Sequence, residues 1–171
     1  NPFDDGGGGW AAEPWSQKEM PLTEEVVRHA AEKSDKALVV IGRTAGESKD
    51  YEDEKGGYRL SIEEEQMLYA VTKYFRKTAV ILNVSCIIDM DFLDREYVNP
   101  VTAVLYVWHG GQEGGNAAAD VISGQVSPCG KLADTIALRM EDYPSTANHG
   151  NEGENVYQED IFVGYRYFET F

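Results

Sequence analysis

The stretch from Ala37 to Tyr51 reads ALVVIGRTAGESKDY, an apolar run rich in β-branched residues that ends in a glycine-containing polar loop. A continuous apolar run of this length predicts a strand buried on both faces, as in a parallel sheet. Loops that leave the C-terminal ends of parallel strands are where such proteins bind ligands and carry out chemistry. Glu47 is the first carboxylate of this loop and is therefore the first candidate for a catalytic residue.

Similar apolar runs alternate with helical patterns along the chain. We expect helices over 22–34, 61–77, 90–96 and 116–123, and strands over 36–42, 78–84, 101–108 and 131–137. Thr23 stands where a helix N-cap is expected, and Ser61 with Glu64 has the spacing of a capping box. This alternation predicts an α/β fold, a mostly parallel sheet with helices on both faces that forms a three-layer α/β/α sandwich.

The two ends of the chain differ from its middle in composition. Residues 1–21 are predicted to form an irregular strap, 22–155 the α/β sandwich domain, and 156–171 an extended, aromatic-rich segment that leads toward a following domain. The strap residues expected to pack on the core are Trp10, Trp15 and Met20.

Composition narrows the classes of function. The chain has 171 residues, of which 42% are hydrophobic, enough for one domain with a buried core. Its net charge of −15 argues against nucleic acid or an anionic membrane as a partner. The spacing of Cys86, Cys129 and the histidines fits neither a disulfide framework nor a metal site, so no metal and no cofactor are expected. The sequence leaves open whether the protein is cytoplasmic or secreted.

Polar loops follow the three best predicted strands. Each of these loops has side chains suited to chemistry. They are Glu47, Asp50, Glu52, Asp53 and Glu54 in the first loop, Asn83, Ser85 and Cys86 in the second, and Trp108, His109, Gln112 and Glu113 in the third. A parallel sheet gathers such loops at one edge. Carboxylates and amides bind sugar hydroxyls, and a tryptophan offers a flat apolar face, so this set favours a hydroxyl-rich ligand. The alternative is a polar rim without a ligand.

Signatures of other enzyme classes are missing. The sequence has no G-x-S-x-G nucleophile elbow, and the spacing within 124–131 differs from that of a phosphate-binding loop. The glycines of 110–115 do not form G-x-G-x-x-G, so a nucleotide- or flavin-binding domain is the weakest alternative.

Several short motifs follow one another in a fixed order from about Trp15 to Phe171. They include residues 40–47, 57–61, 82–84, 108–115, 119–121, 127–132 and 160–168. Together they resemble the C-terminal α/β-sandwich domain of glycoside hydrolase family 3, the β-glucosidase and β-xylosidase family. The resemblance implies a retaining mechanism in which an aspartate nucleophile comes from a preceding (β/α)8 barrel and the acid/base glutamate from a loop of the sandwich domain.

The resemblance places the acid/base role on Glu47. Residues 46–51 stand where many family members have Gly-Glu-Gly-x-Asp-Arg, with Ser48 in place of the second glycine and Tyr51 in place of the arginine. Glu52 and Glu54 are the fallback candidates. The residues expected to bind substrate are Asp50, Trp108, His109, Gln112 and Glu113.

The resemblance also implies what this chain works with. Its partners would be a β-linked oligosaccharide or aryl glycoside, hydrolysed at the non-reducing end, and the N-terminal (β/α)8 barrel of the same parent chain. We expect the first strand–helix unit of the sandwich and the nucleophile to be absent from this chain, and the chain alone to be inactive. The alternative is a non-catalytic domain that binds sugar or braces the barrel.

Overall fold

The computed structural model describes residues 14–44 and 50–171 of the chain. The chain divides into two compact units, Asn1–Pro128 and Cys129–Phe171. Trp10 and Glu47 lie outside the described residues.

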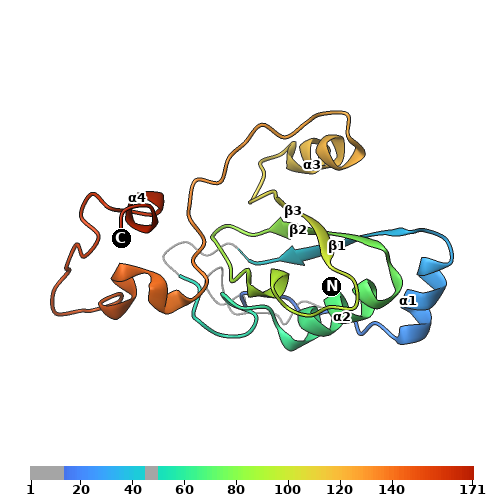
Figure 1. Cartoon of the computed structure of the whole chain (residues 1–171), viewed down its shortest axis with the longest axis horizontal. Coiled ribbons are helices and arrows are strands. Elements are labelled where there is room, and N and C mark those ends of the chain that lie inside the picture. The colour runs from blue at the N-terminus through green and yellow to red at the C-terminus, as the bar shows by residue number, and fades with distance from the viewer. Residues whose placement is uncertain (1–13, 45–49) are drawn as a thin grey trace. The chain divides into compact units, whose positions relative to one another are not determined.

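The first unit is built on a three-stranded parallel sheet in the order β1-β2-β3 (Figure 1). The strands are β1 (Lys36–Gly42), β2 (Lys77–Asn83) and β3 (Val101–Tyr106). In this register Val80 of the central strand pairs with Val39 on one side and with Val104 on the other. The predicted α/β fold and three of its predicted strands are confirmed.

The described helices of the first unit are α1 (Glu24–Ala31), α2 (Ile62–Tyr74) and α3 (Gly114–Ser123), with a 3₁₀ helix, η1, over Asp91–Leu93. Of these, α1 and α2 begin at residues whose side chains cap the helix. The Thr23 hydroxyl accepts a hydrogen bond from the backbone N–H of Val26, 3.3 Å away, at the start of α1. At the start of α2, the Ser61 hydroxyl accepts from the N–H of Glu64, and the Glu64 carboxylate accepts from the N–H of Ser61. Both predicted caps are therefore present.

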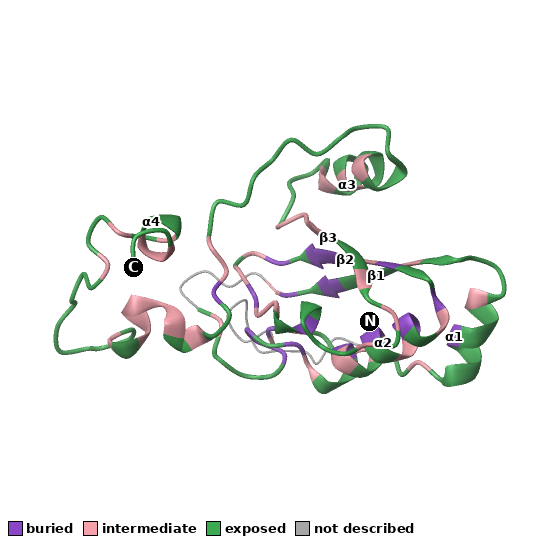
Figure 2. Ribbon diagram, viewed as in Figure 1, coloured by how far each residue is buried: buried purple, intermediate pink, exposed green. Residues whose placement is uncertain are grey.

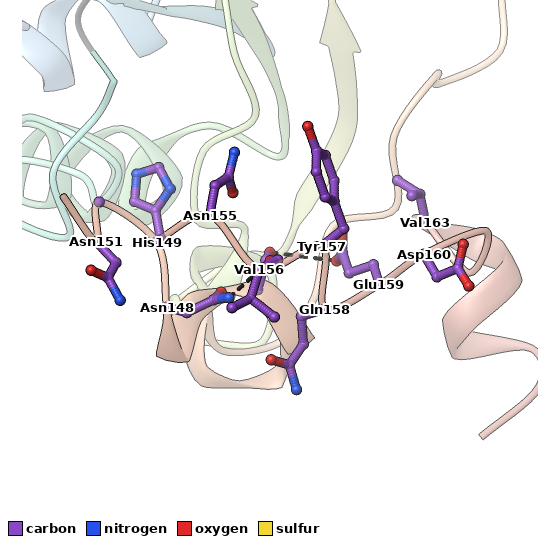
Figure 3. A pocket seen from close by; sticks show the side chains of 12 residues that line it. Asn148, His149, Asn151, Asn155, Val156, Tyr157, Gln158, Glu159, Asp160 and Val163 are labelled. Atoms are coloured by element: carbon purple, nitrogen blue, oxygen red, sulfur yellow. Dashed lines mark hydrogen bonds between the residues drawn. The ribbon is translucent and has the colours of Figure 1, made fainter. Parts of the chain in front are cut away.

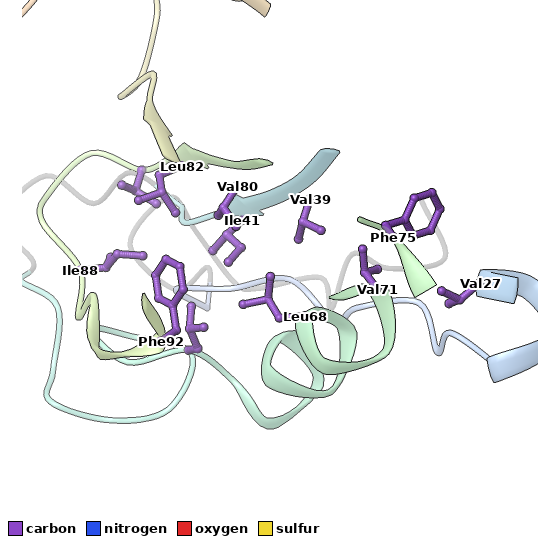
Figure 4. Close-up of a cluster of buried hydrophobic side chains, with 12 residues drawn as sticks. Val27, Val39, Ile41, Leu68, Val71, Phe75, Val80, Leu82, Ile88 and Phe92 are labelled. Atoms are coloured by element: carbon purple, nitrogen blue, oxygen red, sulfur yellow. The ribbon is translucent and has the colours of Figure 1, made fainter. Parts of the chain in front are cut away.

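The apolar core lies between one face of the sheet and α2 (Figure 4). It contains Val27, Val39, Ile41, Leu60, Leu68, Val71, Phe75, Val80, Leu82, Val84, Ile88 and Phe92, all buried. This cluster fixes how the sheet sits on α2, since burying side chains of this size contributes about 1.5–3 kcal/mol each.

The prediction that strand 36–42 is buried on both faces is wrong. Val39 and Ile41 are buried, but Leu38 and Val40 between them are 55% and 56% exposed. A continuous apolar run makes both faces of a strand suitable for burial, but among the described helices only α2 packs closely on this sheet. Helix α3 lies on the other side of the sheet in Figure 1, yet none of its residues is buried (Figure 2).

The described part of the predicted strap, 14–21, contacts the rest of the first unit through Trp15. The Trp15 side chain is only 7% exposed, as expected, and its carbonyl accepts a hydrogen bond from the N–H of Thr44 at 2.7 Å. Met20 is 59% exposed, so the prediction that it packs on the core is wrong. Its side chain lies instead beside the surface of α2 with Glu63 and Met67.

The second unit contains short helices and turns. They are the 3₁₀ helices Met140–Asp142 and Pro144–Ala147 and the helix α4 (Tyr165–Phe168). The predicted strand over 131–137 is not formed, because this segment is held by the Tyr143 hydroxyl, which accepts from the Ala137 N–H and donates to the Thr135 carbonyl. The predicted extended conformation of 156–171 is also wrong: it folds into turns and α4, with Phe168 edge-on to Tyr143.

A buried ion pair joins the end of β1 to the start of α2. The Arg43 side chain donates through Nη1 to Glu64 Oε1 at 2.6 Å and through Nη2 to Glu64 Oε2 at 2.9 Å. It also donates to the backbone carbonyls of Gly42, Gly57 and Arg59. An arginine side chain has five N–H groups, and here each has an acceptor. The pair therefore holds the turn that precedes α2 against the end of β1.

Removing either partner of this pair should strongly destabilise the fold. Glu64→Gln and Arg43→Met are each expected to lower the free energy of unfolding by about 3–5 kcal/mol, because the partner left behind is buried and unpaired. Urea denaturation measures the change. Arg28→Met, which breaks the exposed Arg28–Glu32 pair, is the matched control and should cost less than about 1 kcal/mol. A loss for Glu64→Gln as small as that of the control would contradict this account.

Candidate active site

The three strands end at one edge of the sheet, and their loops leave it side by side. The backbone ladder continues one residue past β1, where the Arg43 N–H donates to the Asn83 carbonyl at 3.1 Å. It also continues past β3, where the Val107 N–H donates to the Leu82 carbonyl at 3.0 Å. Parallel pairing therefore brings the three predicted loops to a common rim.

Side-chain hydrogen bonds link the loop of the central strand to both neighbours. The Tyr51 hydroxyl lies 2.9 Å from the Ser85 hydroxyl and accepts from the Ser85 N–H at 3.3 Å, which joins the loop after β1 to the loop after β2. At the end of β3, the Tyr106 hydroxyl accepts from the Ile88 N–H and donates to the Cys86 carbonyl. The loop after β2 is thus held from both sides.

A third link spans the rim from β3 to β1. Nε2 of His109 lies 2.9 Å from the carbonyl oxygen of Arg43. Because a carbonyl can only accept, this nitrogen must carry the proton. The backbone of Arg43 therefore holds His109, while its side chain holds Glu64.

Trp108 stands next to His109 with an unusual backbone. Its φ is 56°, in the left-handed region that bulky residues rarely adopt. Its ring centroid lies 4.4 Å from that of Tyr106, and its side chain is half-buried. Such conformations persist only where their surroundings enforce them, and they gather at functional sites. The ring contact and the His109 bond on either side of this residue supply that constraint.

The other predicted substrate-binding residues have accessible side chains. Asp50, Gln112 and Glu113 are exposed. Glu113 precedes α3 and accepts a hydrogen bond from the Asn116 side chain. Their part in binding a substrate stays a prediction.

The fallback candidates Glu52 and Glu54 are also exposed and belong to one tight turn. The Glu52 carbonyl accepts from the N–H groups of Glu54 and Tyr58. Within this turn Asp53 accepts two hydrogen bonds from the Arg59 side chain, at 2.6 and 2.8 Å, and these bonds hold the pKa of Asp53 below its usual value. Asp53 is therefore held ionised, with its charge paired with that of Arg59.

Sequence reasoning missed Glu19, which lines a cavity of about 210 Å³ together with Gln17, Gly42, Arg43 and Thr44. Burial raises the pKa of Glu19, and the nearby charge of Glu64 raises it further. No motif marks Glu19, since the fold alone brings it to the end of β1. The sequence also did not indicate that Arg43 forms a buried ion pair, although it did show that its partner, Glu64, stands at a capping-box position.

The second unit has a larger cavity of about 450 Å³ (Figure 3). Its polar lining includes Asn148, His149, Asn155, Tyr157 and Glu159. None of the residues predicted from the sequence to bind substrate lines it, so we place the candidate site at the rim of the sheet.

Two searches cover only the described part of the chain. Among those residues, no three His, Cys, Asp or Glu side chains are grouped so that they could hold a metal ion. Over the same residues, no helix has the length and apolar character needed to cross a membrane.

Comparison with known proteins identifies the family. The model of the glycosyl hydrolase family 3 C-terminal domain matches residues 16–165. The chain belongs to this family. A β-glucosidase from Ruminococcus albus is 52% identical over 98% of the chain, which spans 17% of that relative. A second β-glucosidase, from Butyrivibrio fibrisolvens, is 36% identical over 92% of the chain.

Solved structures of the family have the same fold. The crystal structure of a β-glucosidase from Paenibacillus barengoltzii matches with a TM-score of 0.94 and 58% identity over 100% of this chain and 18% of that one. β-Glucosidase 3B from Thermotoga neapolitana, solved in complex with glucose, matches with a TM-score of 0.79 and 35% identity over 91% of this chain and 23% of that one. The chain therefore spans only about a fifth of the length of these relatives.

The raised pKa of Glu19 predicts a pH-dependent effect on stability. The folded protein binds this proton more tightly than the unfolded chain, so ionised Glu19 disfavours folding once the pH rises above its ordinary pKa of 4.5. Glu19→Gln should therefore raise the urea midpoint at about pH 7 and change it little at about pH 4, where the carboxyl is largely protonated in both states. An equal effect at both pH values would contradict this explanation.

Proposed function

We propose that this chain supplies the general acid/base, Glu47, of a retaining β-glycosidase that releases terminal non-reducing β-linked sugars. The nucleophile would stand on a (β/α)8 barrel of the same parent chain. The observation that carries the proposal is the linked rim of the sheet: Thr44 and Asp50, the described residues on either side of 45–49, follow β1 at the edge where the other two loops meet.

The chemistry requires two carboxyl groups. A retaining glycosidase uses one as a nucleophile on the anomeric carbon and the other as an acid that protonates the leaving oxygen and then as a base that activates water. An acid that works near neutral pH needs a raised pKa, which burial or a nearby negative charge provides. Exposed Asp50 is a source of such charge close in sequence, whereas the charge of Asp53 is paired with that of Arg59.

The remaining rim residues fit one wall of a sugar site. Trp108 would present its ring to a sugar face, and His109, Gln112, Glu113 and Asp50 would bind hydroxyl groups. The substrate would be a β-linked oligosaccharide or an aryl glycoside. The names of the relatives, which are β-glucosidases, favour a glucoside.

The domain order proposed for the parent chain follows from the same family. The barrel would precede residues 22–155, and 156–171 would lead toward a following domain. Since the chain spans 17% of the relative from Ruminococcus albus, that relative has ample length for both.

Replacement of Glu47 should produce the kinetics of a missing acid. In the intact enzyme, Glu47→Gln is expected to lower kcat/KM by about 10²–10⁴-fold on substrates with poor leaving groups, such as cellobiose. It should change kcat/KM far less on 2,4-dinitrophenyl β-glucoside, whose leaving group needs no proton. Azide should restore turnover of the activated substrate by replacing the water that the base no longer activates.

Three matched glutamine variants identify the acid. Glu52→Gln and Glu54→Gln test the fallback positions, and Glu25→Gln, on the exposed surface of α1, is the control. The same leaving-group dependence in one of the fallback variants, with normal kinetics in Glu47→Gln, would move the role to that residue. If none of the variants shows this leaving-group dependence, the result would favour the alternative, a domain that binds sugar or braces the barrel without taking part in catalysis.

The chain alone should not hydrolyse glycosides. We expect no release of nitrophenol from 4-nitrophenyl β-glucoside by the purified 171-residue chain, because one of the two required carboxylates stands elsewhere. Turnover that persists through purification and disappears in Glu47→Gln would contradict the proposed division of the site.

A further inference from the structure

The loop that bears Glu47 is anchored on both sides by described residues. We infer that Tyr51, packed on Trp15 and hydrogen-bonded to Ser85, is a positioning residue for the acid/base; this inference rests on the function proposed for Glu47. We call these three side chains the Tyr51 anchor.

Trp15 contacts the chain both before and after residues 45–49. Its carbonyl accepts the N–H of Thr44 at 2.7 Å, and its ring meets that of Tyr51 edge-on, with centroids 4.5 Å apart and an interplanar angle of 82°. Trp15 is itself buried, at 7% exposure. Thr44 and Tyr51 are therefore both in contact with one buried residue.

The Tyr51 hydroxyl adds a directional restraint. It lies 2.9 Å from the Ser85 hydroxyl and accepts the Ser85 N–H at 3.3 Å. Ser85 follows β2, the central strand, and the next part of its loop is held by the Tyr106 hydroxyl through Cys86 and Ile88. Tyr51 is thus attached to a loop that cannot shift without breaking further bonds.

A short distance along the chain separates this anchor from the acid. Glu47 is three residues from Thr44 and four from Tyr51, and each residue spans at most about 3.6 Å. A displaced anchor therefore changes the range of positions open to Glu47. Proton transfer needs hydrogen-bond reach to the leaving oxygen, and a shift of about 1 Å can cost as much as 10²-fold in rate.

Position 51 also explains a departure from the family pattern. Tyr51 stands where many members have arginine, and here its ring and hydroxyl both have partners. A phenol carries no positive charge at neutral pH, so Tyr51 adds no cation of the kind that lowers the pKa of a carboxyl group, as a guanidinium would.

Tyr51→Phe tests the role of the hydroxyl in the intact enzyme, since it keeps the ring against Trp15 and removes both bonds to Ser85. We expect kcat/KM on cellobiose to fall by about 3–10-fold, the effect of one or two lost neutral hydrogen bonds. On 2,4-dinitrophenyl β-glucoside it should stay within about twofold, because that leaving group needs no acid. Ser85→Ala should act in the same way, and the double variant should be no worse than Tyr51→Phe alone.

Tyr69→Phe is the matched control, a tyrosine on α2 whose side chain is 53% exposed. It should leave both substrates unaffected. Equal losses on the two substrates in Tyr51→Phe would indicate a purely structural role and overturn the inference, as would additive effects of the Tyr51 and Ser85 changes.

Glu47→Gln, assayed in parallel, separates the two proposals. If it shows the leaving-group dependence of a missing acid while Tyr51→Phe behaves like the control, only the positioning role is overturned. If Glu47→Gln lacks that dependence, the acid/base assignment falls and the positioning role falls with it. Dependence in both variants, larger in Glu47→Gln, is the expected result.

Discussion

The ion pair between Arg43 and Glu64 connects the elements that shape the rim of the sheet. Both side chains are almost completely buried, and removing two charges from water costs several kcal/mol each. The structure offsets that cost with two direct bonds between the partners and with backbone acceptors for the remaining Arg43 donors. Glu64 also caps α2 through the Ser61 N–H. One interaction therefore fixes the end of β1, the turn before α2 and the first turn of the helix.

Arg43 also contributes to the rim through its backbone, because its carbonyl accepts a hydrogen bond from the His109 side chain. Together with the Tyr51–Ser85 and Tyr106–Cys86 bonds, this contact joins all three loops at the ends of the strands. Parallel sheets leave such loops close together but do not order them relative to one another. Here hydrogen bonds between side chains and neighbouring loops supply that order.

Local sequence patterns predicted helices and their caps well, but they predicted poorly which faces are buried and which strands form. The capping box at Ser61 was correct because its partners lie three residues apart, so no distant contact is needed. The prediction that Leu38 and Val40 are buried was wrong, because apolar composition shows that a face of the strand could be covered but not whether a helix covers it. The strand predicted over 131–137 was wrong for a related reason. Its apolar residues have strand propensity, but the Tyr143 hydroxyl forms hydrogen bonds with its backbone, and the described second unit has no strand for it to pair with.

The sequence by itself determined the α/β class, the parallel order implied by alternating helices and strands, and the family to which Glu47 and its loop belong. These depend on periodicity, capping and motif order, which are properties of neighbouring residues. Only the tertiary structure decided that Arg43 pairs with Glu64, that Tyr51 bonds to Ser85, and that Glu19 lies in a cavity with a raised pKa. Such contacts join residues far apart in the chain, and burial, charge and hydrogen-bond geometry exist only once the sheet has brought them together.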